Sequence, residues 1–248
     1  MNIFILCAGL GKRLEHKTLN KPKCLVEVNK IPILQRLLEQ LEQIGINREK
    51  IILCSGYLNN KLPKEYAQLH NDLYSSTNMI YTLFKALNNF NQNLLLKEDS
   101  LIIYGDCLYD IEILSLISNY HFSKEDVLIP IDQNWIEQWQ MRYANPYDDA
   151  ETLIYDKESM KLLNIGEKTL KPEDYMGQFM GIFKIKKNSM KLFIGEYKNL
   201  TKTLQNNISS TEFINLSLKK IFYKVIPLEY KWSEVDNLKD LAVAESKF

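Results

Sequence analysis

The chain has 248 residues, of which 46% are hydrophobic and 25% charged, the balance of a globular protein with a sizeable core. Lys and Arg together number 31, as do Asp and Glu, so no overall charge attracts nucleic acid or an anionic membrane. The four cysteines lie far apart without a Cys-x-x-Cys pair, which argues against a disulfide framework or a zinc site and favours reduced thiols.

The first half of the chain predicts alternating strands and helices. Residues 2–8 form a continuous apolar run, typical of a strand buried on both faces of a parallel sheet. A helix is expected after Pro32 and should end near Gly45, because leucines recur there at helical spacing. The next elements are expected as strand, helix and strand at 51–54, 80–87 and 101–104. This order predicts βαβ units and an α/β fold with a mostly parallel central sheet.

The second half is less regular. Strands are expected at 127–131, 176–185 and 225–226, and helices at 213–221 and just after Asp236. We find no internal repeat and no flexible linker, so a single domain over residues 1–248 is expected. Residues 1–110 would form its nucleotide-binding half and residues 111–248 its acceptor-binding half.

The apolar start of the chain is not expected to act as a membrane anchor. It has no positively charged segment before it, Leu6 precedes Cys7 where a lipoprotein signal needs a small residue, and Lys12 and Arg13 follow directly. No other apolar run approaches membrane-spanning length. We therefore expect a cytoplasmic protein that does not bind membranes.

The strongest local feature is the segment LCAGLGKRLEHKTLNKPKCL at residues 6–25. Glycines 9 and 11 let backbone amides approach a phosphate closely. Five cations follow, namely Lys12, Arg13, Lys17, Lys21 and Lys23. The Walker A pattern does not fit, because Arg13 stands where Ser or Thr is needed, and the Rossmann pattern lacks its third glycine at Leu14. A purely structural turn is the alternative, but the cations directly behind a first strand favour an anion site.

Two aspartates have both a structural and a functional interpretation. Asp106 follows the predicted third strand, where it could simply be a turn residue. Asp236 precedes an apolar helix and could simply be its N-cap. The carboxyl ends of parallel strands form the usual ligand-binding edge of such a sheet, and the glycine loop, Gly56 and Asp106 all fall there.

Taken together, these segments resemble the nucleotide-sugar pyrophosphorylase superfamily of nucleotidyltransferases. LCAGLGKRL followed by NKPKCLVEVNKIPIL is similar to its signature loop and lysine, and EVDN is similar to its second metal motif. SSTNMIYTL and RYANPYDDAE look like segments of the short bacterial branch that uses CTP, which includes choline-phosphate and aminoalkylphosphonate cytidylyltransferases and a capsule-pathway member that acts on phosphoglutamine. One departure is Lys12, at a position that is often Ser or Thr in the family.

The resemblance implies a Rossmann-like three-layer sandwich and a complete set of site residues. Lys23 and Arg13 would be catalytic, and Asp106 and Asp236 would bind Mg²⁺. Arg142 and Lys168, by their charge, and Trp139, by its π-face, are candidates for acceptor binding, and a structural or surface role is the alternative for each. The nucleotide would be bound by Leu6, Ala8, Gly9, Leu10, Gly11, Lys12, Arg13, Lys23, Ser76, Thr77, Asn78 and Asp106.

The reaction implied is the transfer of CMP from CTP to a small phosphorylated acceptor that bears an amine or amide. L-glutamine phosphate is the leading acceptor, followed by choline phosphate and aminoethylphosphonate. The acidic cluster Asp148, Asp149 and Glu151 could lie near the acceptor's ammonium group or be a solvated loop. The sequence is compatible with a homodimer and does not fix the oligomeric state.

Three other functions compete with this one. A sugar 1-phosphate nucleotidyltransferase would use UTP or dTTP, and a catalytically silent sensor would bind a nucleotide without turnover. A glycosyltransferase of similar architecture is disfavoured, because Leu108 breaks the Asp-x-Asp pattern after Asp106. The presence of Lys23, Asp106 and Asp236 together argues against the sensor.

Overall fold

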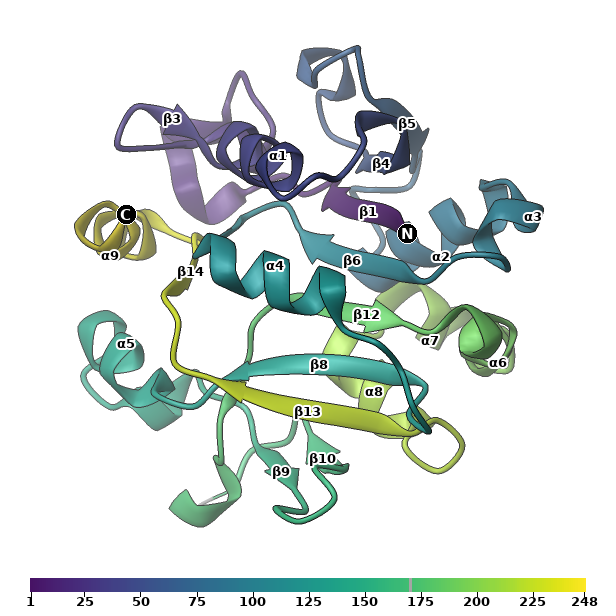
Figure 1. Ribbon diagram of the computed structural model, residues 1–248. Helices are drawn as coiled ribbons and strands as arrows, with labels where there is room; N and C mark the ends of the chain where they lie inside the picture. Colours follow the sequence, from purple (N-terminus) through teal and green to yellow (C-terminus); the bar gives the residue numbers. More distant parts are fainter. Residues whose placement is uncertain (170) are drawn as a thin grey trace.

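The computed structural model describes residues 1–169 and 171–248, and its centre is one eight-stranded sheet (Figure 1). Seven of its strands follow the order β11-β8-β12-β6-β1-β4-β5. The eighth strand, β13, lies off this path and pairs with β8. The bounds are β1 Asn2–Cys7, β4 Ile51–Ser55, β5 Ala67–His70, β6 Ser100–Tyr104, β8 Val127–Asp132, β11 Gln178–Phe179, β12 Ile182–Ile185 and β13 Tyr223–Leu228.

The N-terminal part of the sheet is parallel and the rest is mixed. β6, β1, β4 and β5 are all parallel neighbours. The apolar sequences of β1, β4 and β6 predict such buried parallel strands, whereas β5 was not predicted. β12 runs antiparallel between β6 and β8, while β13 pairs with β8 in parallel. The prediction of an α/β fold with a mostly parallel central sheet is confirmed.

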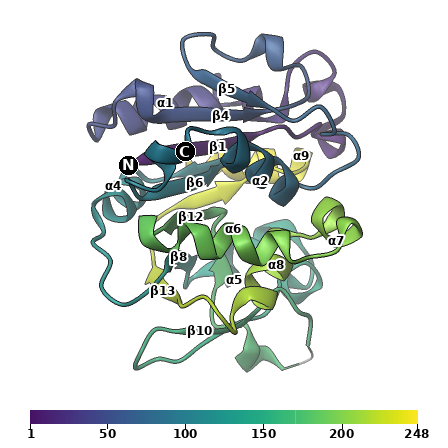
Figure 2. The ribbon, with the colours of Figure 1, turned by 90° about the vertical axis from the view of Figure 1, so that its right-hand side faces the viewer.

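Helices cover both faces of this sheet (Figure 2). α1 (Ile33–Gln43) and α4 (Ile111–Asn119) pack against each other on one face. α2 (Met79–Asn89) lies on the other face against β1 and β4, in contact with α6 (Met190–Lys198), α7 (Lys202–Asn207) and α8 (Ser210–Ser217). The result is a three-layer sandwich. None of the helices in the described ranges is long and apolar enough to cross a membrane.

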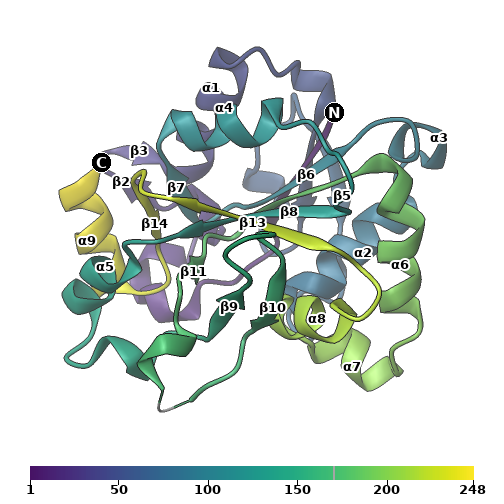
Figure 3. The same cartoon turned by 60° about the horizontal axis from the view of Figure 1, so that its bottom comes forward.

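Smaller elements complete one end of the molecule (Figure 3). There α5 (Trp135–Arg142) contacts α9 (Leu238–Lys247), and α9 contacts β14 (Trp232–Glu234). The remaining strands and helix are β2 Glu27–Val28, β3 Ile31–Pro32, β7 Cys107–Tyr109, β9 Leu153–Tyr155, β10 Leu162–Ile165 and α3 Gln92–Leu95. Among the 3₁₀ turns are η1 Lys12–Thr18 and η2 Lys23–Leu25. All four cysteines are free, as the expected reduced thiols would be, and all four are buried.

Two hydrophobic cores hold these layers together. The larger one is continuous through the sheet and its helices. The smaller one packs Leu14 of the N-terminal loop against Val235 and Leu241 near the C-terminus. Because apolar burial is the main favourable term in folding, this second core helps to hold the first and last segments of the chain side by side.

In the second half of the chain, several helices and strands have boundaries that differ from the predicted ones. The strand expected at 176–185 is two strands, because the chain bends at Gly181, whose φ is +69°. The helix expected at 213–221 is α8, which begins earlier because Ser209 and Glu212 form a capping box. Asn237, not Asp236, is the N-cap of α9, since its side chain accepts the amides of Lys239 and Asp240.

Candidate functional site

The loop after β1 is shaped by a glycine with a left-handed backbone. Gly11 has φ +64°, and a Cβ there would lie 2.8 Å from Cγ2 of Thr18 and 3.1 Å from Cβ of Lys23. Its carbonyl accepts hydrogen bonds from Leu14 N (2.8 Å) and Thr18 Oγ1 (3.0 Å). Only glycine therefore lets this loop fold down over Lys23.

Three carboxylates gather beside that loop, from segments more than a hundred residues apart. Asp106 follows β6, and Glu234 and Asp236 lie at and just after the end of β14. Pairing of β14 with β7 brings the segments together, and Val235 N donates to Asp106 O at 3.1 Å. One oxygen from each carboxylate lies within 4.8 Å of the others. Such a group of hard oxygen ligands suits Mg²⁺.

Lys23 lies among these carboxylates. Its Nζ is ion-paired with both Asp106 and Asp236, and its side chain is only 12% exposed. Arg13 reaches the same group, with Nη2 2.7 Å from Oδ2 of Asp236. The two predicted catalytic cations therefore contact the predicted metal-binding residues directly.

The charges in this cluster shift the pKa values of its members. Burial alone would lower the pKa of Lys23, but the carboxylates around it reverse this and raise it above its usual range. Burial and the charges of Asp236 and Asp106 raise the pKa of Glu234 to about 8. Burial opposes a low pKa at Asp236, but Lys23 and Arg13 still hold it below its usual value. Positive charge is thus what keeps several carboxylates together here.

Two cavities open on either side of this cluster. One, of about 350 Å³, lies at the carboxyl ends of β1 and β6. It is lined by Leu6, Cys7, Ala8, Gly9, Leu10, Lys12, Lys23, Cys24, Tyr74, Ser75, Thr77, Asn78, Met79, Thr82, Tyr104, Gly105 and Asp106. We call it the loop cavity.

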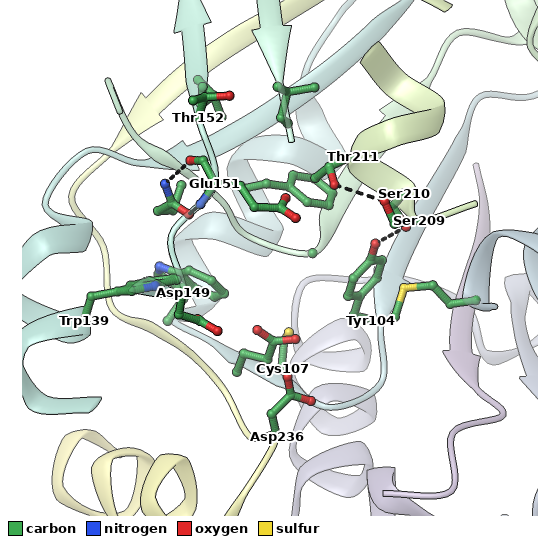
Figure 4. Close-up of a pocket in the computed structure, with 18 of the residues that line it drawn as sticks. Tyr104, Cys107, Trp139, Asp149, Glu151, Thr152, Ser209, Ser210, Thr211 and Asp236 are labelled. Carbon is green, nitrogen blue, oxygen red and sulfur yellow. Dashed lines mark hydrogen bonds between the residues drawn. The ribbon is translucent and has the colours of Figure 1, made fainter. Parts of the chain in front are cut away.

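The other cavity, of about 330 Å³, is built mainly by the second half of the chain (Figure 4). Trp139, Asp149 and Glu151 lie on one side of it, Tyr104, Ser210 and Thr211 on another, and Asp236 at its base. Glu234 and Arg13 line it as well. We call it the acidic cavity. Asn78, Met79 and Tyr104 line both cavities, so the two adjoin. Asp106 lines the loop cavity and Asp236 the acidic cavity, and a carboxylate oxygen of each lies within 4.8 Å of the other, so the cavities also approach each other at the carboxylates.

Comparisons with known proteins show the family to which the chain belongs. Residues 3–170 match the family described as the MobA-like NTP transferase domain. The chain belongs to this family. It is a nucleotidyltransferase, as the resemblance implied.

Individual relatives and structures agree with this assignment. The transferase is 31% identical to the CTP:phosphoglutamine cytidylyltransferase of Campylobacter jejuni subsp. jejuni serotype O:2 over the full length of both chains. It is 28% identical to the choline-phosphate cytidylyltransferase of Streptococcus pneumoniae, over 66% of this chain and 68% of that one. The inositol-1-phosphate CTP transferase of T. maritima has the same fold, with a TM-score of 0.73 at 17% identity over 98% of this chain and 94% of the other.

The structure places most of the predicted nucleotide-binding residues of the transferase at the loop cavity. Arg13 is an exception that lines the acidic cavity, and Gly11 shapes the loop without lining either cavity. Ser76 lines neither, because its hydroxyl donates to Leu73 O at 3.3 Å within a turn. Its neighbour Ser75 lines the loop cavity instead.

Of the three candidates for acceptor binding, only Trp139 lines the acidic cavity. Arg142 is 4% exposed and lies behind the wall in an ion pair with Asp240, because a buried guanidinium needs a carboxylate partner. Lys168 is exposed and its Nζ donates to Asp148 O at 2.5 Å. Neither Arg142 nor Lys168 lines either cavity, so their predicted role in acceptor binding stays a prediction.

Sequence reasoning missed Glu234 as a member of the carboxylate group. The signal was present, since Glu234 lies two residues before Asp236 and alternate residues of an extended segment point the same way. Asp149 and Glu151 of the predicted acidic cluster line the acidic cavity, whereas Asp148 does not.

Proposed function

We propose that this transferase is a Mg²⁺-dependent cytidylyltransferase that moves CMP from CTP to a small phosphorylated acceptor bearing an amine or amide. L-glutamine phosphate is the leading acceptor. The observation that supports this most strongly is the pair of cavities that adjoin at Lys23, Asp106, Glu234 and Asp236. Two reactants bound in adjoining cavities would place their phosphates together at that point.

The loop cavity is assigned to CTP. Backbone amides of Gly9 to Gly11, with Lys12, would hold the β- and γ-phosphates, and the base would lie near Ala8 and residues 75–79. Asp106, Glu234 and Asp236 have the oxygen atoms that suit Mg²⁺, and this ion would neutralise phosphate charge when bound.

The acidic cavity is assigned to the acceptor. Arg13 lines this cavity beside Asp236 and would attract the acceptor phosphate. On one side of the cavity, the carboxylates of Asp149 and Glu151 and the indole of Trp139 offer partners for an ammonium group. Burial raises the pKa of Glu151, and a cation beside it would favour its charged form.

In the reaction, an oxygen of the acceptor phosphate forms a bond to the α-phosphorus of CTP. The bond from that phosphorus to the bridging oxygen breaks, and pyrophosphate leaves with the electron pair. Lys23 would lie between the two reacting phosphates and stabilise the charge of the transition state. The attacking oxygen is already ionised at neutral pH, so no general base is needed.

A substrate panel tests this proposal. Each NTP is supplied with L-glutamine phosphate, choline phosphate, aminoethylphosphonate and glucose 1-phosphate, and pyrophosphate release is followed. We expect CTP to exceed UTP by at least about 10-fold in kcat/KM, because UTP leaves groups that should bind the cytosine amino group unpaired. Amine-bearing acceptors should react and glucose 1-phosphate should not. Turnover of UTP with glucose 1-phosphate alone would assign the protein to sugar activation.

A further inference from the structure

One buried ion pair joins the metal-binding segment to the wall of the acidic cavity. Arg142, at the end of α5, donates Nε to Oδ1 of Asp240 at 2.7 Å and Nη2 to Oδ2 at 3.2 Å. The two side chains are 3% and 1% exposed. A two-bond contact of this kind fixes orientation as well as distance.

On one side, this pair holds the backbone next to the carboxylate group. Oδ2 of Asp240 also accepts the backbone N–H of Asp236 at 3.1 Å and Nδ2 of Asn237 at 2.9 Å. The backbone N–H of Asp240 in turn donates to Oδ1 of Asn237 at 3.0 Å. The direction in which Asp236 presents its carboxylate therefore depends on the Asp240 side chain.

On the other side, the same guanidinium supports the acidic cavity from behind. Its central carbon lies 4.8 Å from the centre of the Trp139 ring, and Nη2 lies 3.9 Å from Oδ2 of Asp149. Trp139 and Asp149 line the cavity, while Arg142 does not (Figure 4). The position of these two cavity residues therefore depends on Arg142.

We propose that Arg142 and Asp240 are positioning residues that couple acceptor binding to the geometry of the metal site. This rests on the proposed function, in which Asp236 binds Mg²⁺ and the acidic cavity takes the acceptor. An acceptor that contacts Trp139 and Asp149 changes the position of Arg142. Through Asp240, this changes the orientation of the Asp236 carboxylate. The loop cavity includes none of these five residues, so the direct contacts of CTP with that cavity do not involve the pair.

The test uses Arg142→Lys and Asp240→Asn in the full-length protein. Lysine keeps the charge but cannot form the fork, and asparagine keeps the shape but loses the charge. We expect the KM for the acceptor to rise roughly 2- to 30-fold in each variant, and the Kd for Mn²⁺ without nucleotide, measured by electron paramagnetic resonance, to rise in the same range. The KM for CTP at saturating Mg²⁺ should stay within about twofold. The double variant should be little worse than the poorer single one.

Lys184→Met is the matched control for general destabilisation. Lys184 is another buried cation, 3% exposed on β12, whose Nζ donates to the carbonyls of Ser118 and Tyr120 outside both cavities. It should lower Tm while leaving the acceptor KM and Mn²⁺ affinity unchanged. If Arg142→Lys behaves like this control, the coupling is wrong. If the wild type turns over no acceptor, the proposed function fails, and unchanged Mn²⁺ binding in Arg142→Lys would separately overturn the positioning role.

Discussion

At the scale of single residues, Lys23 occupies the place where a metal ion would contact the carboxylates. Its ammonium pairs with Asp106 and Asp236, whose oxygens together with one from Glu234 form the group that suits Mg²⁺. An ammonium group and a divalent cation are attracted by the same charges and compete for the same oxygens. The Lys23 side chain is mostly buried, so its removal should affect more than catalysis.

Lys23→Ala should separate these effects. We expect kcat/KM to fall roughly 10²- to 10⁴-fold, because a charge that acts on the transition state is lost. In EDTA the Tm should also fall, since the carboxylates lose their cationic partner, and Mg²⁺ should restore part of it. Without nucleotide, the Kd for Mn²⁺ should be at least about 10-fold lower for the variant than for the wild type.

Lys17→Ala is the control, because Lys17 is an exposed cation of the same loop that lines neither cavity. It should change neither Mn²⁺ binding nor Tm. Near-wild-type turnover of Lys23→Ala would contradict its catalytic role, and unaltered Mn²⁺ affinity would contradict the competition.

The carboxylates themselves provide a second prediction. EDTA should abolish turnover, and Asp106→Asn and Asp236→Asn should each reduce kcat at least about 10²-fold, because a neutral amide is a poor ligand for a hard cation. Glu234→Gln should raise the Kd for Mn²⁺ by about 10-fold if its carboxylate is a ligand. Calorimetric titration with Mn²⁺ measures this directly. A Glu234→Gln variant with wild-type Mn²⁺ affinity would restrict the metal site to the two aspartates.

The sequence could indicate a site residue when the residues that act with it lie close to it in the chain. The glycine loop and Lys23 lie within one short segment and carry the signature of the superfamily, so their roles could be proposed directly. Arg142 could not be understood in this way, because its partner Asp240 is 98 residues away and no pattern links the two. Its charge favoured a role in binding the acceptor, but burial gives it a carboxylate partner inside the protein.

At the scale of elements, the prediction succeeded where hydrophobic periodicity is strong. β1, α1, β4, α2 and β6 follow the expected order within one or two residues, because buried strands and amphipathic helices have distinct patterns. The β7–β14 pair was not predicted, although it brings Glu234 to Asp106. Its strands have three residues each and lie far apart in the chain, so neither length nor spacing reveals the pairing.

The turn from β6 to Asp106 makes a third prediction possible. A Cβ at Gly105 would lie 2.7 Å from Leu6 O and 2.9 Å from Sγ of Cys7, both on β1. Gly105→Ala should therefore push β1 and the Asp106 turn apart and destabilise the fold by about 1–3 kcal/mol. For a chain of this size that corresponds to a fall in Tm of roughly 2–12 °C.

Gly195→Ala is the matched control, because Gly195 lies in α6 and a Cβ there would meet nothing within 4 Å. It should raise stability by about 0.5–1 kcal/mol, since alanine favours the helix. Thermal unfolding of both variants checks the pair. Equal Tm values for Gly105→Ala and the wild type would mean that the close approach of the Asp106 turn to β1 is unimportant.

At the scale of the whole molecule, the proposed nucleotide and acceptor halves share one sheet. β12, from the acceptor half, pairs with β6 of the nucleotide half, and β8 pairs with β12 in turn. The larger hydrophobic core is continuous from Ile3 to Trp232, and the smaller one joins Leu14 to Leu241. Neither half can expose its edge of the sheet without breaking backbone hydrogen bonds and opening the core.

We therefore expect the chain to unfold in one cooperative transition. Calorimetric and van't Hoff enthalpies should agree, and far-ultraviolet dichroism and tryptophan fluorescence should report the same Tm. All three tryptophans, Trp135, Trp139 and Trp232, belong to the proposed acceptor half, so their fluorescence tests whether that half unfolds with the rest. Mg²⁺ and CTP, bound in the loop cavity as proposed, should raise the Tm reported by both signals together. At a ligand concentration 100 times Kd, the free energy of unfolding should rise by about 2.7 kcal/mol. A fluorescence transition that stays in place while the dichroism shifts would show that the halves unfold separately, and the coupling through β6 and β12 would then be weak.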